Sequence, residues 1–323
     1  MTPDMTAHEP PPHPPGYQLA PGYVVVEHVR RGEDLDCYEA WSAQRYCRCF
    51  IKTLRPDAAT DASARRHLKR EARLLLSLSH PHLVRAYDYI ARPDGQPPLL
   101  VLENLTGATL GYLLDGDSRR PGRGRPAKAG RGRPATPGRG RPAKLSATDL
   151  SYLGQQLCSA LRYLHSRGYL HLDVKPSNII ASQGVARLID LSLARPPGRC
   201  PAGTGTPGYM SPEQITGGEL GPPADVWGIG LVLYEAATAT QPFDIPDVSL
   251  STGSTLSHCH AQHARPAPRI RARRRLPPDV ATVIDACLHR DPDQRPTLEV
   301  LDAALATLTA QPPGAGIRVE VGV

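Results

Sequence analysis

Large aromatic side chains are scarce in this chain of 323 residues, because Phe, Trp and Tyr together make up 5% of it. Leu, Val, Ile and Ala must therefore supply most of the buried volume of any core. The chain has no run of about 18 apolar residues, so we expect no transmembrane helix. Its first residues are rich in His and Pro and lack the charged-then-apolar order of a secretory signal.

A disulfide framework is also lacking. Seven cysteines are scattered without a repeated spacing, and an odd number leaves at least one of them unpaired. Reduced thiols in a cytoplasmic protein are the simplest account of this pattern. We therefore predict a cytoplasmic location and no membrane partner.

Acidic residues are missing from one segment, between Arg119 and Lys144, which carries ten Arg or Lys. Removing these ten cations from the net charge of +7 leaves a charge of −3 for the remaining residues. The body of the protein is thus mildly acidic, and its basicity belongs to an insertion.

The most informative residues present are 171–178, His-Leu-Asp-Val-Lys-Pro-Ser-Asn. They place a carboxylate, an ammonium and an amide at fixed spacing, at Asp173, Lys175 and Asn178. Such a set can hold a hydroxyl, a phosphate oxygen and a metal ion around one transferring phosphoryl group. Taken singly, each of these residues is more often an ordinary surface group, so their order and spacing carry the argument.

Further segments fit the same chemistry. Phe50-Ile51-Lys52 ends a strand-like run, Glu71 lies in a helix-like run, and Ile189-Asp190-Leu191-Ser192 and residues 205–213 follow downstream. In this order the residues resemble the signature of the protein kinase superfamily. Lys175, two places after Asp173, is similar to the eukaryotic-type serine/threonine branch found in bacteria. The resemblance spans about residues 20–308.

The resemblance implies a role for each matching residue, with ATP and Mg²⁺ as cofactors and Ser or Thr side chains of proteins as substrates. Asp173 is the expected catalytic base, Lys175 offsets charge on the γ-phosphate, and Thr206 contacts both. Asn178 and Asp190 are the expected Mg²⁺ ligands. The expected nucleotide-binding residues are Lys52, Glu71, Gly32, Glu103 and Leu105, of which Glu103 and Leu105 lie in the hinge segment, 103–105, whose backbone contacts adenine. Leu102, just before the hinge, resembles the gatekeeper. Asp225 and the ion pair of Glu213 with Arg295 are the expected structural residues.

The predicted fold class is α+β, in the two-lobed arrangement of a protein kinase. Apolar and β-branched spacing predicts a small lobe at 17–105, with strands and one helix, and a larger, mainly helical lobe at 106–310. We expect residues 1–16 to be a disordered Pro-rich arm and 311–323 to be a tail. Strands are predicted at 23–29, 38–41, 47–54, 84–90 and 99–103, and helices at 57–78, 146–166, 224–238, 278–289 and 297–308.

Three departures from the family pattern stand out. Only Gly32 remains of the three glycines that cover the phosphates, and Ser192 replaces the last glycine of the metal-binding motif. Leu172 replaces an arginine that ordinarily pairs with a phosphorylated activation loop, so we predict that phosphorylation of Thr204 is not required. A weakly active or inactive pseudokinase that binds nucleotide as a scaffold is the alternative interpretation.

The basic insertion at 117–144 contains the unit Gly-Arg-Gly-Arg-Pro three times, beginning at 122, 130 and 138. Such a segment cannot bury a core, so we expect it to be disordered. The unit resembles the AT-hook, whose arginines enter narrow A·T minor grooves. Residues 119–144 are thus a possible contact for DNA or another polyanion, while a generic flexible basic loop is the competing interpretation.

Overall fold

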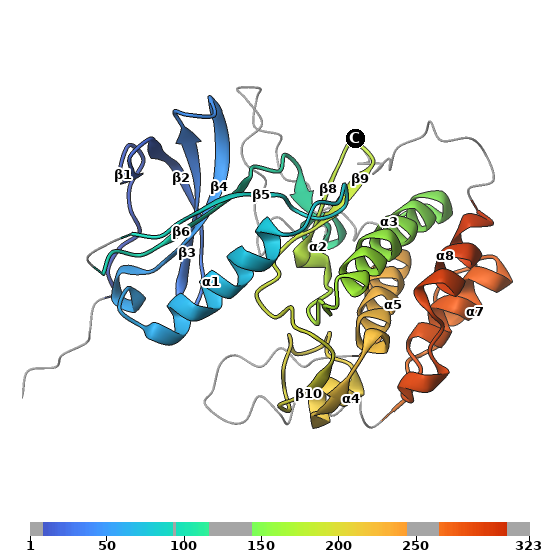
Figure 1. The fold of residues 1–323 in the computed structure, drawn as a ribbon. Coiled ribbons are helices and arrows are strands. Elements are labelled where there is room, and N and C mark those ends of the chain that lie inside the picture. The colour runs from blue at the N-terminus through green and yellow to red at the C-terminus, as the bar shows by residue number, and fades with distance from the viewer. Residues whose placement is uncertain (1–8, 93–94, 116–143, 244–264, 309–323) are drawn as a thin grey trace, which may run out of the picture. The chain divides into compact units, whose positions relative to one another are not determined.

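The computed structural model describes residues 9–92, 95–115, 144–243 and 265–308 of the chain (Figure 1). These residues form two compact units. The first comprises the chain up to Ser79 together with Val84–Leu105, and the second comprises His80–Leu83 and the chain from Thr106 onward. Among the helices of the described residues, none combines the length and the hydrophobicity that a membrane span requires. The basic insertion, apart from Lys144, and the expected tail lie outside the described residues.

The first unit is built on one antiparallel sheet of six strands, in the order β1-β2-β3-β4-β6-β5. Tyr38 and Ile51 are neighbours across β3 and β4, and both are fully buried on one face of this sheet. The opposite face carries Lys52, because side chains alternate along a strand. The strands are β1 (Gln18–Ala20), β2 (Tyr23–Arg31), β3 (Leu35–Ser42), β4 (Cys47–Leu54), β5 (Ala86–Ile90) and β6 (Leu99–Glu103).

The long helix among the described residues of this unit is α1 (Ala62–Leu76), which runs alongside the sheet (Figure 1). The carboxylate of Asp61 caps it by accepting hydrogen bonds from the amides of Ser63 and Ala64. The helix therefore begins five residues later than predicted, and Pro56–Ala58 forms a separate short 3-10 helix. Its buried face includes Leu68, Glu71 and Leu75, so the predicted helix is confirmed with shorter bounds.

The described part of the expected disordered arm, residues 9–16, differs from that expectation. The amide of His13 donates to the hydroxyl of Tyr38, at 3.1 Å, and the His13 ring stacks on Tyr17. The carbonyl of Pro10 accepts from Arg31, and the amide of Gly16 donates to Val25. The arm is ordered here because these backbone groups find partners on the sheet.

The second unit is mainly helical. α3 (Ala147–Ser166) begins at its cap Ser146, and its leucine stripe packs against α5 (Pro222–Thr238) and α8 (Leu298–Ala306). Every residue of α5 from Ala224 to Thr238 is buried, as expected for a helix that is apolar on all sides. α7 (Pro278–Cys287) packs on α5. These four helices confirm the predicted ones, and the two units together confirm the predicted α+β class.

The second unit also contains short strands and short helices. One three-stranded sheet has the order β7-β8-β9, and β10 pairs with β11. The sequence patterns did not predict these strands, because runs of two to four residues carry too little periodicity. The elements are β7 (Ala108–Thr109), α2 (Leu110–Asp115), β8 (Ile179–Ser182), β9 (Val185–Leu188), β10 (Gly198–Cys200), α4 (Pro212–Thr216) and β11 (Gly218–Leu220).

Candidate active site

A buried ion pair joins the sheet and the helix of the first unit. Nζ of Lys52, on β4, donates to Oε1 of Glu71, on α1, at 2.7 Å. Lys52 is 7% exposed and Glu71 is 2% exposed. Because an isolated charge is costly to bury, each group is stabilised by the other, and the position of the ammonium is fixed. The two predicted residues are thus brought together.

The turn between β2 and β3 contains Gly32, whose amide donates to the carbonyl of Leu35 at 2.7 Å. Arg31 joins the flanking strand ends, because it donates two hydrogen bonds, of 2.9 and 2.8 Å, to the buried carboxylate of Asp36. His28 also contacts Asp36. Burial raises the pKa of Asp36, but the hydrogen bonds from Arg31 and His28 outweigh it and hold the pKa below its ordinary value.

A second arginine supports the same turn from the end of β4. Arg55 donates to the carbonyl of Glu33 at 3.1 Å and pairs with both carboxylate oxygens of Asp57. Its guanidinium also lies 3.1 Å from Glu9 of the ordered arm. In this chain, arginine side chains hold a turn that the family pattern builds from glycine.

At the other end of β4, Cys49 pairs with Glu103, the last residue of β6. The Glu103 side chain accepts a hydrogen bond from the amide of Arg85, at 2.7 Å. Leu105, the other predicted adenine contact, is the last residue of this unit. Lys52 is paired with Leu100, so it lies three residues along the same paired strands from Glu103.

Three side chains of the second unit converge on the carboxylate of Asp173. Lys175 Nζ donates to Oδ2 at 2.7 Å, the Thr206 hydroxyl donates to Oδ1 at 2.6 Å, and Asn178 Nδ2 donates to Oδ2 at 2.9 Å. Lys175 also donates to Thr206, at 2.5 Å. The structure thus brings together four of the residues predicted for catalysis and metal binding. A carboxylate held in this way has a fixed orientation and can accept a proton from a hydroxyl group.

Asp225, at the start of α5, secures the backbone that leads to Asp173. Its carboxylate has no solvent exposure and accepts hydrogen bonds from the amides of His171 and Leu172, both at 2.8 Å, and from the ring of His165 at 2.7 Å. Leu172 has a φ of +63°, a left-handed conformation that costs a non-glycine residue about 1–2 kcal/mol. The three hydrogen bonds offset that cost.

Close packing adds to this constraint. Gly228 of α5 lies against Val174, so that a Cβ at position 228 would come within 2.8 Å of the Val174 side chain. The neighbouring ring of His171 is fully buried, and burial lowers the pKa of His171. The ring accepts a hydrogen bond from the Asp173 amide through Nδ1, which agrees with a neutral imidazole. The loop is therefore set by packing as well as by polar contacts.

Asn178 and Asp190 offer oxygen atoms suited to a hard cation. Both protons of Asn178 Nδ2 are used by Asp173, on its carbonyl and its carboxylate, so the amide oxygen is the atom left for a ligand. The amide of Ile189 donates to the carbonyl of Asn178, which ties Asp190 to the same loop. One carboxylate and one amide oxygen fit Mg²⁺, which takes few protein ligands and completes its shell with phosphate and water. Within the described residues, no cluster of three or more His, Cys, Asp or Glu suits a metal.

Arg295 anchors α4 to the helical core. Its guanidinium donates to both carboxylate oxygens of Glu213, at 2.6 and 2.8 Å, and to three backbone carbonyls. It also stacks over the ring of Trp227, at 5.1 Å. The predicted pairing of Glu213 with Arg295 is therefore present, in the two-pronged form that arginine favours.

Several contributing residues were missed by sequence reasoning. Gln214 donates to the carbonyls of Leu172 and Thr204, and thereby joins two loops of the second unit. Asp36 and Arg55 organise the turn around Gly32. Arg31 and Asp36 could have been predicted to pair, because they lie across a predicted hairpin from each other. Gln214 carries no such local signal.

Comparison with known proteins agrees with this geometry. Residues 23–305 match the protein kinase domain family, so the chain belongs to that family. It is 32% identical over 269 residues to the serine/threonine-protein kinase PkaA of Streptomyces coelicolor, which covers 79% of this chain and 42% of that protein. It is 31% identical over 257 residues to PknB of Mycolicibacterium smegmatis, covering 76% of this chain and 36% of that protein.

A third relative, the serine/threonine-protein kinase pkn2 of Myxococcus xanthus, is 30% identical over 290 residues, covering 84% of this chain and 31% of that protein. The chain thus spans less than half the length of these curated relatives. The predicted resemblance to bacterial kinases of the eukaryotic type is confirmed.

Proposed function

We propose that this chain is a protein-serine/threonine kinase that transfers the γ-phosphate of ATP to hydroxyl groups of protein substrates. The observation that carries the proposal is the Asp173 carboxylate with Lys175, Thr206 and Asn178 hydrogen-bonded to it. Phosphoryl transfer requires mainly positioning and charge neutralisation, and this cluster supplies both. Membership of the protein kinase family supports the same activity.

In this proposal Asp173 orients the substrate hydroxyl and accepts its proton. Lys175 and Lys52 supply positive charge to the phosphate oxygens, and Glu71 holds Lys52 in place. Asn178 and Asp190 would hold Mg²⁺, which neutralises charge on the phosphates when it is bound. Gly32, Glu103 and Leu105 are the proposed contacts to the rest of the nucleotide.

Transfer of radiolabel from ATP to a Ser- or Thr-containing protein tests the proposal. The unchanged protein should transfer phosphate, and Asp173→Ala and Asp190→Ala should each lower the rate by at least about 10³-fold, because each removes a group on which the transition state depends. Both variants should still unfold in one cooperative transition, which shows that the lost rate does not come from unfolded protein. Transfer that neither substitution changes would show that another protein in the preparation is the source.

A nucleotide-binding scaffold without turnover is the second candidate. The turn from Arg31 to Asp36 favours it, because side chains stand where the family pattern has glycines and Glu33 and Asp34 add negative charge. ATP binding without any phosphate transfer, in the presence of Mg²⁺, would support this candidate over the first.

A reducing, cytoplasmic compartment is part of the proposal. The six cysteines among the described residues are all free, which agrees with it. Contact of residues 119–144 with DNA or another polyanion is a further candidate, supported by the threefold Arg-containing repeat alone.

A further inference from the structure

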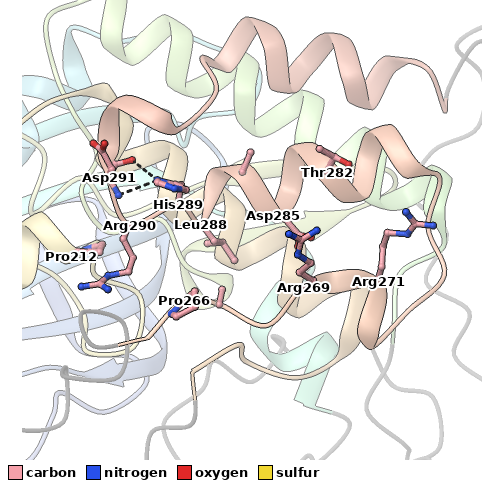
Figure 2. Close-up of a pocket in the computed structure, with 12 residues that line it drawn as sticks. Pro212, Pro266, Arg269, Arg271, Thr282, Asp285, Leu288, His289, Arg290 and Asp291 are labelled. Carbon is pink, nitrogen blue, oxygen red and sulfur yellow. Dashed lines mark hydrogen bonds between the residues drawn. The ribbon is translucent and has the colours of Figure 1, made fainter.

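The second unit contains a pocket of about 780 Å³ that the catalytic cluster does not use. Its walls come from three parts of the chain: the segment from Pro266 to Arg271, α7 with the residues that follow it, and Pro212 at the start of α4. Figure 2 shows Arg290 toward one end, Arg271 toward the other, and Arg269 between them. The pocket therefore presents a row of three guanidinium groups.

These three arginines are exposed, and none forms a hydrogen bond or ion pair through its side chain with another described residue. The two acids of the pocket are already engaged. Asp285 accepts from the amide of Ile270 at 2.8 Å and also interacts electrostatically with Arg269, and Asp291 accepts from the amide of Asp293 at 3.1 Å. Three arginines against two carboxylates leave the lining with an excess of positive charge that a ligand can engage.

The structure also divides the sequence run of five arginines at 269–275. Arg274 is half-buried, donates to the carbonyl of Ala237 at 2.9 Å and has a pKa lowered by burial, so it has a structural role. Arg273 and Arg275 are exposed but lie outside the pocket wall. Only Arg269 and Arg271 contribute to the pocket, which makes it a localised feature and not a uniformly basic face.

The place of the pocket in the chain connects it with catalysis. Pro212 is six residues from Thr206, whose hydroxyl contacts Asp173. Six residues span at most about 20 Å, so an extended peptide of six to ten residues is long enough to reach from Asp173 to Pro212, which lies at the Arg290 end of the pocket (Figure 2). Glu213, adjacent to Pro212, is fixed by Arg295, which makes this wall rigid.

We propose that this pocket, through Arg269, Arg271 and Arg290, binds an acidic segment of the protein substrate. Binding there would hold the acceptor Ser or Thr of the same substrate near Asp173. The inference rests on the proposed kinase function. Planar guanidinium groups pair well with carboxylates, and holding one end of a peptide raises the local concentration of the other end.

The test compares two peptides with the same Ser acceptor and an eight-residue spacer, one ending in a cluster of four Glu and the other in four Gln. The unchanged protein should show about a tenfold lower KM for the acidic peptide with a similar kcat, and this preference should fade as salt is added. Arg269→Gln/Arg271→Gln should remove the preference. Arg273→Gln/Arg275→Gln has the same charge change outside the pocket and should keep it.

A binding measurement separates this inference from the proposed function. A labelled peptide with the Glu cluster and no acceptor should bind by fluorescence anisotropy, and the 269/271 variant should weaken that binding about tenfold while the 273/275 variant does not. If binding follows this pattern but no phosphate is transferred, the proposed binding site for an acidic segment is supported and the proposed kinase activity is refuted. Equal affinity for acidic and neutral peptides would overturn the proposal that this pocket binds an acidic segment. The same result is expected if other residues of this chain fill the pocket, so that case also counts against the proposal.

Discussion

Asp225 is a fully buried carboxylate on which the geometry of the neighbouring loop depends. Burial alone would raise the pKa of Asp225, but the hydrogen bonds from His165 and from the amide of His171 lower it below its usual value of 3.8. The folded protein therefore prefers the ionised form more strongly than the unfolded chain does. The stability that results is complete well above pH 4 and is lost as the pH falls through and below that value.

Asp225→Asn should show this dependence. At pH 7 the substitution should lower the free energy of unfolding by about 2–3 kcal/mol, because it removes the charge from a buried carboxylate that accepts three hydrogen bonds. The difference in the free energy of unfolding between the parent and the variant should narrow between pH 5 and about pH 3, because Asp225 of the parent becomes protonated as the pH falls. Denaturant unfolding of both proteins across this range measures it. Parallel pH profiles would mean that Asp225 does not titrate differently in the two states.

At the scale of elements, the segment between β9 and α4 is held by apolar and backbone contacts. Leu172 packs in a buried cluster with Cys200 of β10 and Leu220 of β11. Strands β10 and β11 pair directly, and Gln214 bridges the carbonyls of Leu172 and Thr204. Leu172 thus takes part in a core at the position where the family pattern has an arginine for a phosphate.

Thr204→Ala should therefore phosphorylate substrate at a rate within about twofold of the parent's rate. The Thr204 hydroxyl makes one described contact, to the carbonyl of Pro201, and no phosphate is needed to order the segment. Gln214→Ala should instead lower kcat, since it leaves two carbonyls without their donor. Steady-state rates with one peptide substrate measure both. Loss of nearly all activity in Thr204→Ala would refute the phosphate-independent arrangement.

The ordered part of the N-terminal arm is a second element with a testable contribution. Deleting residues 1–15 should lower the free energy of unfolding by about 1–3 kcal/mol, because Tyr38 and Arg31 lose their partners in the arm. Thermal unfolding measures the change, and a variant that lacks only residues 1–8 separates the contribution of residues 9–15. Equal melting temperatures for the parent and the longer deletion would show that the arm contacts add nothing.

At the scale of the whole molecule, the basic insertion and the catalytic cluster are predicted to act separately. α2 ends at Asp115 and α3 begins at Ala147, so the insertion joins two helices of the same unit. Lengthening a surface connection has a small entropic cost. Replacing residues 117–144 with a short Gly/Ser linker should leave kcat within about twofold of the parent.

The same replacement should remove binding to polyanions, because it removes ten cations. Gel shifts with A·T-rich and G·C-rich duplexes at about 0.15 M salt measure both the affinity and any preference. Equal retention of DNA by the parent and the shortened protein would exclude the insertion as the contact.

Much of the fold was predictable because its long elements carry strong periodicity. The leucine stripe of α3 and the β-branched run of β2 follow directly from side-chain spacing. β1, α4 and β7 to β11 were missed because each is short and gains its stability from pairing and packing with distant residues. The start of α1 was misplaced because a proline-led turn and the cap at Asp61 compete with the apolar pattern.

The amino-acid sequence by itself determined which chemical groups this protein has and in what order, since the motif around Asp173 needs only local spacing to be read. Tertiary structure alone decided which groups meet. Gln214 joined the loops of Leu172 and Thr204, Leu172 entered an apolar cluster, and two of five arginines joined Arg290 around one pocket. Contacts between residues far apart in the chain depend on packing and burial, and a local pattern of residues carries no record of either.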